Sequence, residues 1–437
     1  MIAPLLVLAA ALAAAAPAAP VRAVKPPALK DDAVRPPLPI DYVPLAVETA
    51  FDLAAIAPGD AVAARTLVDR LANRAPLARA DVLSAEGLAN RNRDARVAWV
   101  LLRAVHVRAA EQARADRRAP VALEHLRRVA GLESSADADV DIVVVLLEQG
   151  RWAEAEREAQ AVAAQRPGDV RGALALGFAL LRQDRAGEAL EVLEAAQAVE
   201  DSKRVRELLA LVRRALASER GMNEARQWHF NVRYEGAPDP ELAGALTARL
   251  ELHYATLAGV FGFEPPATVP VVLFTKDRYY AVTGAPHWSG GAYSSLDGRI
   301  RVPARGLTPE ALSEIDATLL HELVHVFVAE RTHGVAPRLL HEALAQYYEG
   351  DRVTSKLDFE ALSALGEGRL GGVGGFYMEA LSFGEYLVQL SGQNHVNDLL
   401  TAIGDAENID AGFQKVYGRN YKQIRDDWKI WAREQYR

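Results

Sequence analysis

Two stretches of the chain repeat each other after an interval of 34 residues. The first, LLEQGRWAEAEREAQAVAAQRPGD, begins at Leu146, and the second, LLRQDRAGEALEVLEAAQAVED, begins at Leu180. When the two are superimposed, Ala155 coincides with Ala189. A period of this length is typical of stacked helical pairs, because one pair is too small to bury its own apolar face and must pack on the next. The repeat therefore predicts an elongated helical array around these stretches.

Individual residues of the two stretches suit a packed pair of helices. Gly177 is small where the first helix must approach its neighbour, Trp152 fills the gap between paired helices, and Pro167 ends the second helix. The pattern resembles the tetratricopeptide repeat (TPR). The resemblance implies a TPR-like helical region over residues 49–222, with a concave surface for a protein or peptide partner. A generic array of helical hairpins is the alternative, and its architecture would hardly differ.

The second half of the chain changes character after Gly221. NVRYEG, VPVVLFT and GRIRVP are short β-branched or aromatic runs bounded by Gly, Pro or Asp, and they are predicted strands. A long amphipathic helix is predicted between the first two, and the chain is expected to be mainly helical from Thr308 onward. The expected fold class is α+β: an N-terminal all-α solenoid is followed by a domain over residues 223–437 with a small sheet.

The beginning of the chain contains no predicted packed element. Residues 1–23 have an apolar core followed by small residues and prolines, which is the layout of a secretory signal peptide. Residues 24–48 contain six prolines and are expected to form an extended tether. No later stretch is long and apolar enough to span a bilayer. We therefore expect export to the periplasm or the extracellular space without a stable membrane span; a disordered leader or an uncleaved anchor is the alternative.

Composition restricts the chemistry that the chain can perform. A net charge of −8 argues against a general nucleic-acid binder, which usually carries a basic excess. The chain has no cysteine, so disulfides, thiolate metal sites and lipid attachment to cysteine are all excluded. Any zinc ion must therefore be held by histidine and carboxylate ligands.

A metal-binding pattern appears at the start of HELVHVFVAERTHGVAPRLLHEALAQYYEG, in which His321, Glu322 and His325 form H-E-x-x-H. Residues at positions i and i+4 lie on one face of a helix, so the two imidazoles can bind one ion. Glu322 then lies beside the ion, where a general base is needed. The pattern predicts one Zn²⁺ per chain on a buried helix; two exposed helix histidines are the alternative reading of the pentapeptide.

The residues leave the third ligand open between His333, His341 and Glu342. A catalytic zinc site has three protein ligands and one open position. His333 lies in a Gly/Pro turn, where no helix fixes its orientation. His341 and Glu342 point about 100° apart on one predicted helix, so they cannot both face the ion. The apolar residues of that helix lie near both side chains and do not decide between them.

The segment PRLLHEALAQYYEG resembles the P-x-W-L-x-E-G-L-A-x-Y signature of gluzincin zinc metallopeptidases. Leu340 replaces the usual Trp and Ala343 the usual Gly. The resemblance implies that Glu342 is the third zinc ligand and that His341 is a neighbour in the cleft. It also places Gln346 where a partner for a zinc-bound histidine would lie, unless this side chain is only polar and exposed.

The chain from about residue 226 to the C-terminus resembles the bacterial peptidase MA-like domains of the gluzincins. In that family GRIRVP would be the edge strand above the cleft, able to take an extended peptide by strand addition. Gly290 and Gly291 would let the backbone approach closely. Tyr377 is either an oxyanion donor or a residue packed in the core. Trp428 and Trp431 are expected to pack the last helix onto the domain.

The resulting hypothesis is an exported zinc metallopeptidase that hydrolyses peptide bonds and recruits a protein or peptide partner through its TPR-like region. His321, His325 and Glu342 would bind Zn²⁺, and Glu322 would be the general base. Two alternatives remain open. The chain could be a catalytically idle binding scaffold with a TPR region and a gluzincin fold, or a zinc hydrolase with a non-peptide substrate.

Overall fold

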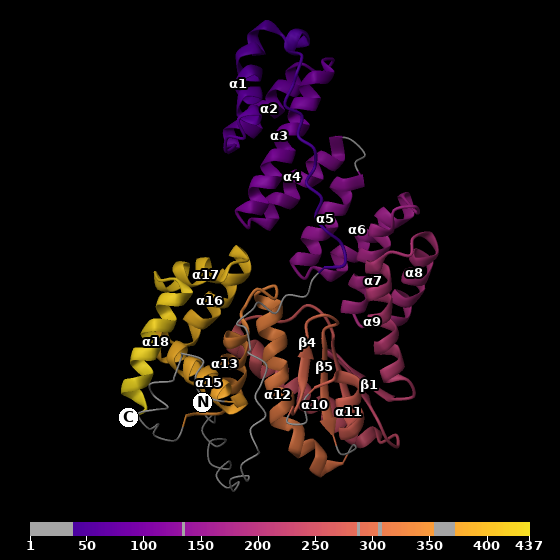
Figure 1. The fold of residues 1–437 in the computed structure, drawn as a ribbon, viewed down its shortest axis with the longest axis vertical. Coiled ribbons are helices and arrows are strands. Elements are labelled where there is room, and N and C mark those ends of the chain that lie inside the picture. Colours follow the sequence, from indigo (N-terminus) through magenta and orange to yellow (C-terminus); the bar gives the residue numbers. More distant parts are fainter. Residues whose placement is uncertain (1–37, 133–135, 286–288, 305–307, 354–371) are drawn as a thin grey trace, which may run out of the picture.

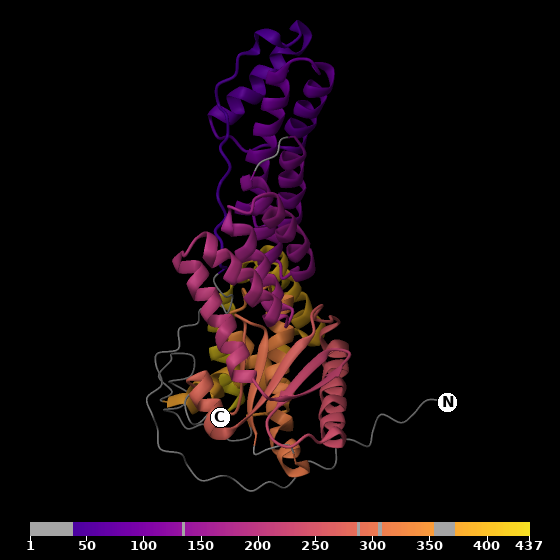
Figure 2. The same ribbon diagram turned by 90° about the vertical axis from the view of Figure 1, so that its right-hand side faces the viewer.

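The computed structural model describes residues 38–132, 136–285, 289–304, 308–353 and 372–437. The helices between residues 61 and 219 form an elongated stack, here called the column. It packs on a second region, here called the lobe, in which the elements between residues 223 and 435 combine a sheet with further helices (Figures 1 and 2). The described part of the chain is therefore mostly helical with one small mixed sheet, which agrees with the α+β class. The proposed signal peptide, residues 1–23, lies outside the described residues. Among the described residues, no helix is long and apolar enough to cross a bilayer.

The column is built from helices that pack in consecutive pairs, α3 with α4, α5 with α6 and α7 with α8. Helices α5 and α7 begin 34 residues apart, as do α6 and α8, so the sequence repeat is also a structural repeat. The elements of this region are η1 (Leu53–Ala55), η2 (Pro58–Asp60), α1 (Ala61–Ala72), α2 (Arg79–Arg91), α3 (Arg96–Ala115), α4 (Ala119–Leu132), α5 (Ala136–Glu148), α6 (Trp152–Gln165), α7 (Val170–Arg182), α8 (Ala186–Val199) and α9 (Lys203–Glu219).

The small residues of the repeat lie where its helices cross. A Cβ atom at Gly177 of α7 would lie 2.7 Å from Cγ of Leu193 in α8, closer than any side chain tolerates. Ala155 and Ala189 are fully buried, and the Trp152 ring packs edge-on against Phe178 with ring centroids 6.1 Å apart. The predicted roles of the glycine and the tryptophan are confirmed.

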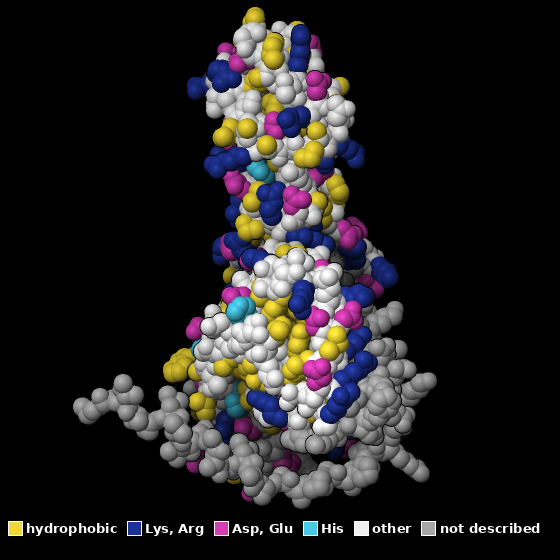
Figure 3. All heavy atoms as spheres, turned by 90° about the vertical axis from the view of Figure 1, so that its left-hand side faces the viewer, with side chains coloured by type: hydrophobic (Ala, Val, Ile, Leu, Met, Phe, Trp, Pro, Cys, Tyr) yellow, Lys and Arg dark blue, Asp and Glu magenta, His cyan; other side chains and the backbone are white. Residues whose placement is uncertain are grey.

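The surface of the column carries charges of both signs. On the face drawn in Figure 3, lysine and arginine alternate with aspartate and glutamate over the repeat region. Some of these charges pair within one helix, as Lys203 does with Glu207 at 3.7 Å in α9. Exposed pairs of this kind contribute about 0–1 kcal/mol each to stability. Packing of the small and apolar residues therefore holds the repeat together.

The lobe contains a five-stranded sheet in the order β1-β2-β3-β5-β4. The central strands β2, β3 and β5 are parallel, and the outer strands β1 and β4 are antiparallel to their neighbours. Alternate residues of a strand face opposite sides, so the sheet has two faces. Helices α10 and α12 cover one face, and α11 packs on the other. The elements are β1 (Asn223–Gln227), β2 (Phe230–Tyr234), α10 (Pro240–Phe261), β3 (Val269–Thr275), α11 (Lys276–Thr283), β4 (Ala292–Ser294), β5 (Arg299–Ala304) and α12 (Pro309–Arg331).

The expectation that GRIRVP is the edge strand is wrong. This run forms β5, which lies between β3 and β4 inside the sheet. The edge near α12 is the short strand β4, Ala292–Ser294, which pairs with Arg299–Arg301 of β5. Strand β4 has only three residues. It is therefore too short to show the period-two alternation that identifies a strand in a sequence.

The C-terminal helices pack around α12 and complete the core of the lobe. They are α13 (Arg338–Glu349), α15 (Gly372–Ser391), α16 (Gln393–Ala406), α17 (Ile409–Tyr417) and α18 (Tyr421–Gln435). Trp428 of α18 is fully buried and donates from its ring nitrogen to the Ser382 hydroxyl at 2.9 Å. The Trp431 ring packs against Tyr386. Both tryptophans hold the last helix on the domain, as predicted.

Residues 38–48 are extended, as expected of a tether, but they are also packed. Ile40 and Leu45 are buried in the hydrophobic cluster of the repeat region. The expectation of an unpacked tether therefore fails for this part of residues 24–48. The reason is that a proline-rich segment can be extended without hydrogen-bonding to itself, which leaves its backbone available to side chains of the column.

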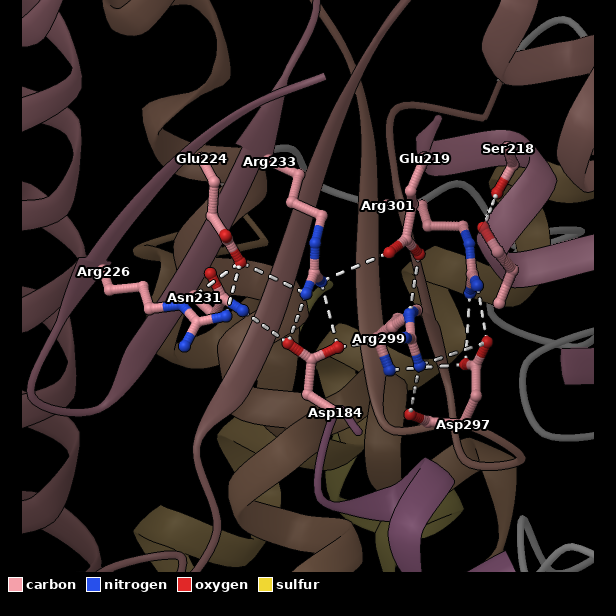
Figure 4. A network of polar contacts seen from close by, with 11 residues as sticks. Asp184, Ser218, Glu219, Glu224, Arg226, Asn231, Arg233, Asp297, Arg299 and Arg301 are labelled. Carbon is pink, nitrogen blue, oxygen red and sulfur yellow. Dashed lines mark hydrogen bonds and ion pairs between the residues drawn. The ribbon is translucent and has the colours of Figure 1, made fainter. Parts of the chain in front are cut away.

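A buried network of charges joins the column to the sheet (Figure 4). Asp184, in the turn between α7 and α8, accepts hydrogen bonds from Arg233 of β2 and Arg299 of β5 at 2.8–2.9 Å. Glu219, at the end of α9, lies 2.8 Å from Arg299 and 3.2 Å from Arg233. Arg299 is fully buried. Removing one partner of such a buried pair leaves an uncompensated charge, so the network fixes the orientation of the sheet relative to the repeats.

Candidate metal centre

The residues of the H-E-x-x-H motif lie in the second half of α12. Thr308 caps this helix by accepting a hydrogen bond from the Ala311 amide, and Pro309 occupies its first position. After α12 the chain turns through His333 and Gly334, both in the left-handed region with φ of 50° and 70°. Helix α13 then packs on α12 and carries Glu342 on the side that faces the motif.

Three potential ligand atoms come together between the two helices. Oε2 of Glu342 lies 3.4 Å from Nε2 of His321 and 3.8 Å from Nε2 of His325. One ligand atom from each residue lies within 4.8 Å of the others. Glu342 is buried, and so is most of each imidazole. The structure therefore brings together the three residues that the sequence analysis names as metal ligands.

The donor set fits a zinc ion. A tetrahedral zinc with bonds of about 2.0–2.1 Å places its ligand atoms roughly 3.3–3.4 Å apart. The separation of Glu342 from His321 has this length at 3.4 Å, and its separation from His325 is longer at 3.8 Å. Oε2 of Glu342 has no hydrogen-bond partner although it is buried. Its separation from the two imidazole nitrogens is too long for a good hydrogen bond and suits two ligands of one ion. Two imidazoles and one carboxylate are also a common ligand set of catalytic zinc.

The other two histidines lie outside this cluster. His341 is buried, with its ring centroid 5.5 Å from that of His325, and it is not one of the residues whose ligand atoms cluster. It is a neighbour of the site, as the family resemblance implies. His333 lines a small cavity at the junction with the column, together with Trp152 and Glu330. The structure thus separates Glu342 from both alternatives that the sequence left open.

Glu349 orients the first histidine. Its Oε2 lies 2.9 Å from Nδ1 of His321, so Nδ1 carries the proton and Nε2 is directed toward Glu342. Gln346, which the resemblance suggests for this role, donates from its side-chain amide to the Glu342 carbonyl of its own helix at 3.2 Å. It is buried, so the alternative of an exposed polar side chain is wrong. The sequence does contain a signal for Glu349. It follows Glu342 by seven residues, which is two helical turns and the same face.

The carboxylate of Glu322 is held by the edge strand. Oε2 of Glu322 accepts a hydrogen bond from the Tyr293 amide of β4 at 2.7 Å. Strand and helix approach closely because a Cβ atom at Gly291 would lie 2.9 Å from Oε1 of Glu322 and 2.8 Å from Cγ2 of Thr318. The close approach expected at this glycine is confirmed. Burial raises the pKa of Glu322 to about 7, which suits a base that exchanges protons near neutral pH.

The two imidazoles have opposite proton affinities. Burial lowers the pKa of His321, but the neighbouring carboxylates of Glu342 and Glu349 outweigh this effect and raise the pKa to about 10. Burial lowers the pKa of His325 to about 3, and the nearby Glu342 opposes this only in part. Since both ligands must be neutral at Nε2 to bind a cation, loading of the site with metal releases the proton of His321.

Tyr377 of α15 also borders the site. Burial raises the pKa of its hydroxyl, and the negative charge of Glu342 raises it further. The hydroxyl also makes a hydrogen bond with Arg338, whose Nε lies 3.6 Å from Oε1 of Glu342. Its raised pKa means that the Tyr377 hydroxyl keeps its proton at neutral pH and can act as a hydrogen-bond donor.

Comparison with protein families bears on the column and not on the metal cluster. Residues 146–212 match the tetratricopeptide repeat family model, and this range covers α6 to α8 together with parts of α5 and α9. No curated protein matches the chain. The repeats at residues 146–212 are therefore tetratricopeptide repeats, a family that typically mediates protein–protein interaction.

Proposed function

We propose that this chain is an exported zinc-dependent metallopeptidase that hydrolyses peptide bonds in the periplasm or the extracellular space. The observation that carries the proposal is the convergence of His321, His325 and Glu342 next to the buried carboxylate of Glu322. The proposed export rests on the apolar core followed by small residues in residues 1–23. The gluzincin relationship, which the family comparison leaves untested, rests on the motif alignment and on this geometry.

Each proposed ligand supplies one atom to the zinc ion. His321 and His325 supply Nε2, Glu342 supplies Oε2, and Glu349 fixes the ring of His321. Zinc, when bound, supplies a Lewis acid that polarises a carbonyl group and lowers the pKa of water at its open position. Arg338 keeps the other oxygen of Glu342 turned away from the cluster.

Glu322 is the proposed general base. The Tyr293 amide holds one oxygen of its carboxylate, so the side chain has a fixed orientation beside the ligand atoms. Glu322 takes a proton from the attacking water and passes it to the leaving amine, a role that its raised pKa suits. Tyr377 is proposed to donate its hydroxyl to the oxyanion that forms at the scissile carbonyl.

Strand β4 is the proposed binding site for the substrate backbone. It is the sheet edge next to α12, and its Tyr293 amide faces Glu322 rather than another strand. An extended peptide that pairs with this edge lies directly against the ligand atoms, and its main-chain groups satisfy the edge. The TPR region is proposed to recruit a protein or peptide partner.

Two alternative functions make different demands on the same residues. A catalytically idle scaffold has no use for a buried base with a raised pKa beside three converging ligand atoms, so the geometry favours an enzyme. A zinc hydrolase with a non-peptide substrate would use the same four residues. The free edge at β4 favours a peptide, because strand addition recognises a polypeptide backbone.

The test compares wild type with Glu322→Gln, a change that keeps the size of the side chain and removes its basicity. Both proteins are loaded with zinc, and cleavage of a broad peptide library is followed by mass spectrometry. Turnover should fall by about 10²–10⁴-fold in the variant while zinc content and melting temperature stay unchanged. Glu310→Gln, an exposed change in the first turn of α12, is the matched control and should keep wild-type turnover.

Two results would reject the proposal in different ways. If zinc-loaded wild type cleaves no peptide in the library, the peptidase function is wrong and the scaffold or a non-peptide substrate gains support. If Glu322→Gln cleaves as fast as wild type, the assignment of the general base is wrong although the enzyme is a peptidase.

A further inference from the structure

An extended segment of the chain runs lengthwise along the column of helices. In Figure 1 residues 38–50, at the indigo end of the described chain, pass along the repeat region between α5 and the helices at its far end. The segment LPIDYVPLAVE, residues 38–48, forms neither helix nor strand. Ile40 and Leu45 are only 4% and 6% exposed and belong to the same hydrophobic cluster as α5 and α7. The column therefore already holds an extended stretch of polypeptide.

The segment lies on the face formed by the first helices of the pairs. Helices α5 and α7 contact each other, as do α7 and α9, so the odd-numbered helices adjoin along the inner side of the stack. These helices supply polar contacts to the segment: Arg103 and Arg114 from α3, Asp141 from α5, and Arg204 from α9. The inner side of a helical solenoid is its usual binding surface. The segment thus occupies the groove in which a partner of this region would bind.

The column contacts the backbone of the segment as well as its side chains. Arg103 donates to the Ala46 carbonyl at 3.1 Å, and Arg204 donates to the Pro39 carbonyl at 3.2 Å. These bonds require an extended chain and do not depend on the identity of the residues that supply the carbonyls. Recognition of this kind suits any extended peptide, and prolines favour it because they hold the chain extended before it binds.

Side chains at three positions add selectivity. Ile40 and Leu45 enter the apolar cluster, and the Arg114 guanidinium stacks on the Tyr42 ring at 3.8 Å from its centroid. Asp41 pairs with Arg204 at 2.5 Å near the rim, where it is exposed. An aliphatic residue, an aromatic residue two positions later and a second aliphatic residue three positions after that therefore fit the groove.

The buried carboxylate of Asp141 distinguishes this groove from an ordinary packing surface, because it binds the backbone of the segment. It is fully buried, and its Oδ1 accepts the Val43 amide at 3.0 Å, while its Oδ2 has no hydrogen-bond partner. A buried carboxylate with so few partners costs stability, so its retention needs a reason. Burial raises the pKa of Asp141 to about 7. Its observed bond is to the backbone of the segment, which is the contact that a peptide ligand would offer.

We propose that residues 38–48 are an intramolecular occupant of the peptide-binding groove of the repeat region, and that the partner is an extended, proline-containing peptide that displaces them. The proposal rests on the partner-binding half of the proposed function and not on the metal centre. An intramolecular occupant on a short flexible linker acts at an effective concentration of about 1 mM. A competing peptide with a Kd of about 100 µM is therefore weakened roughly tenfold in the intact chain.

The first experiment measures binding of a fluorescein-labelled synthetic peptide of residues 38–50 by anisotropy. The full chain with Ile40→Asp and Leu45→Asp, which expels the segment, should bind this peptide at least about tenfold more tightly than wild type. The full chain with Val62→Asp and Leu83→Asp is the matched control, since it makes the same kind of change at two exposed side chains of α1 and α2, and it should behave like wild type. A folded double variant, checked by circular dichroism, that binds the peptide no better than wild type would overturn the proposal.

A second experiment remains decisive even if the double variant does not fold. Because the chain has no cysteine, Val43→Cys provides a single attachment site for a spin label on the segment. The label should be immobilised in the otherwise wild-type chain, and an excess of unlabelled peptide 38–50 should mobilise it, whereas a scrambled peptide should not. A label that is mobile from the start, or one that the peptide does not release, would show that the groove does not exchange its occupant. Neither experiment uses turnover, so failure of the peptidase proposal leaves this one standing.

Discussion

Within the described residues, the column and the lobe each contain a pair of histidines on neighbouring turns or helices, and the pair in the lobe belongs to the candidate metal site. In the column, His106 of α3 and His125 of α4 approach each other with their Nδ1 atoms 3.0 Å apart. In the lobe, His321 and His325 direct their Nε2 atoms toward one oxygen of Glu342. Both pairs have ring centroids about 5 Å apart, at 5.2 Å and 4.9 Å, so proximity alone does not distinguish them.

The direction of the nitrogen atoms makes the difference. His106 uses Nδ1 for its bond with His125, and its nearest carboxylate, Glu86, lies 3.9 Å from Nε2 on the opposite side of the ring. The possible ligand atoms in the column therefore diverge and satisfy one another by hydrogen bonding. In the lobe the outer nitrogen of His321 is bound by Glu349, so its inner nitrogen is left for an ion. A metal site thus requires converging lone pairs, and the predictions below test that distinction.

The largest expected effect is on zinc content. His321→Ala removes one of three ligands and should reduce bound zinc from about one per chain to nearly none, as measured by elemental analysis after dialysis. His125→Ala makes the same change in the other pair and should leave the zinc content as it is in wild type. Loss of zinc from His125→Ala instead would show that the column, and not the lobe, holds the ion.

The second prediction separates the neighbouring residues of α13. Glu342→Ala should lose most of the zinc, because it removes the oxygen on which both imidazoles converge. His341→Ala should keep its zinc, since His341 is not part of the cluster, although its melting temperature should fall through loss of buried packing. The opposite result, with zinc retained by Glu342→Ala and lost by His341→Ala, would mean that the third ligand is misassigned.

A smaller effect is expected from the residue that orients His321. Glu349→Gln removes the charge that holds the Nδ1 proton and should weaken zinc affinity by about 10–100-fold without abolishing binding. Competition with a fluorescent zinc chelator measures the change. Gln346→Ala, on the same helix, is the control, and its zinc affinity should stay close to that of wild type. In the described structure, the side-chain amide of Gln346 donates to the backbone carbonyl of Glu342 and not to a histidine.

The smallest effect concerns the pair in the column and its response to pH. Burial lowers the pKa of His106 to about 4, against about 6.5 in an unfolded chain. The unfolded state therefore binds a proton first, and the stability that His106 contributes is present above pH 6.5 and is lost as the pH falls toward 4. The difference in melting temperature between wild type and His106→Gln should shrink over that interval. The difference in melting temperature between wild type and His395→Gln, a change at an exposed position on α16, provides the baseline. If both differences change equally with pH, the prediction is contradicted.

Sequence periodicity alone determined the features that repeat within a helix or between helices. The 34-residue offset predicted the register of α5 to α8, because each position in a repeat meets the same neighbours. The spacing of His321 and His325 placed both rings on one face of α12, because helical geometry is local. The spacing between Glu342 and Glu349 carried the same kind of information, although the sequence analysis considered Gln346 and not Glu349 for this role.

Tertiary structure decided everything that depends on which segments meet. Strand β4 is the edge of the sheet because it pairs with β5, and its three residues are too few for the sequence pattern to predict a strand. The sequence marked residues 38–48 as extended, but the inner face of the helices gave that extended chain a place to bind. Only the packing of α13 on α12 brings Glu342, and not His341, into the cluster of ligand atoms with the two imidazoles. The physical reason is the same in each case: side-chain direction along one helix follows from local geometry, whereas convergence of ligand atoms requires contacts between distant parts of the chain.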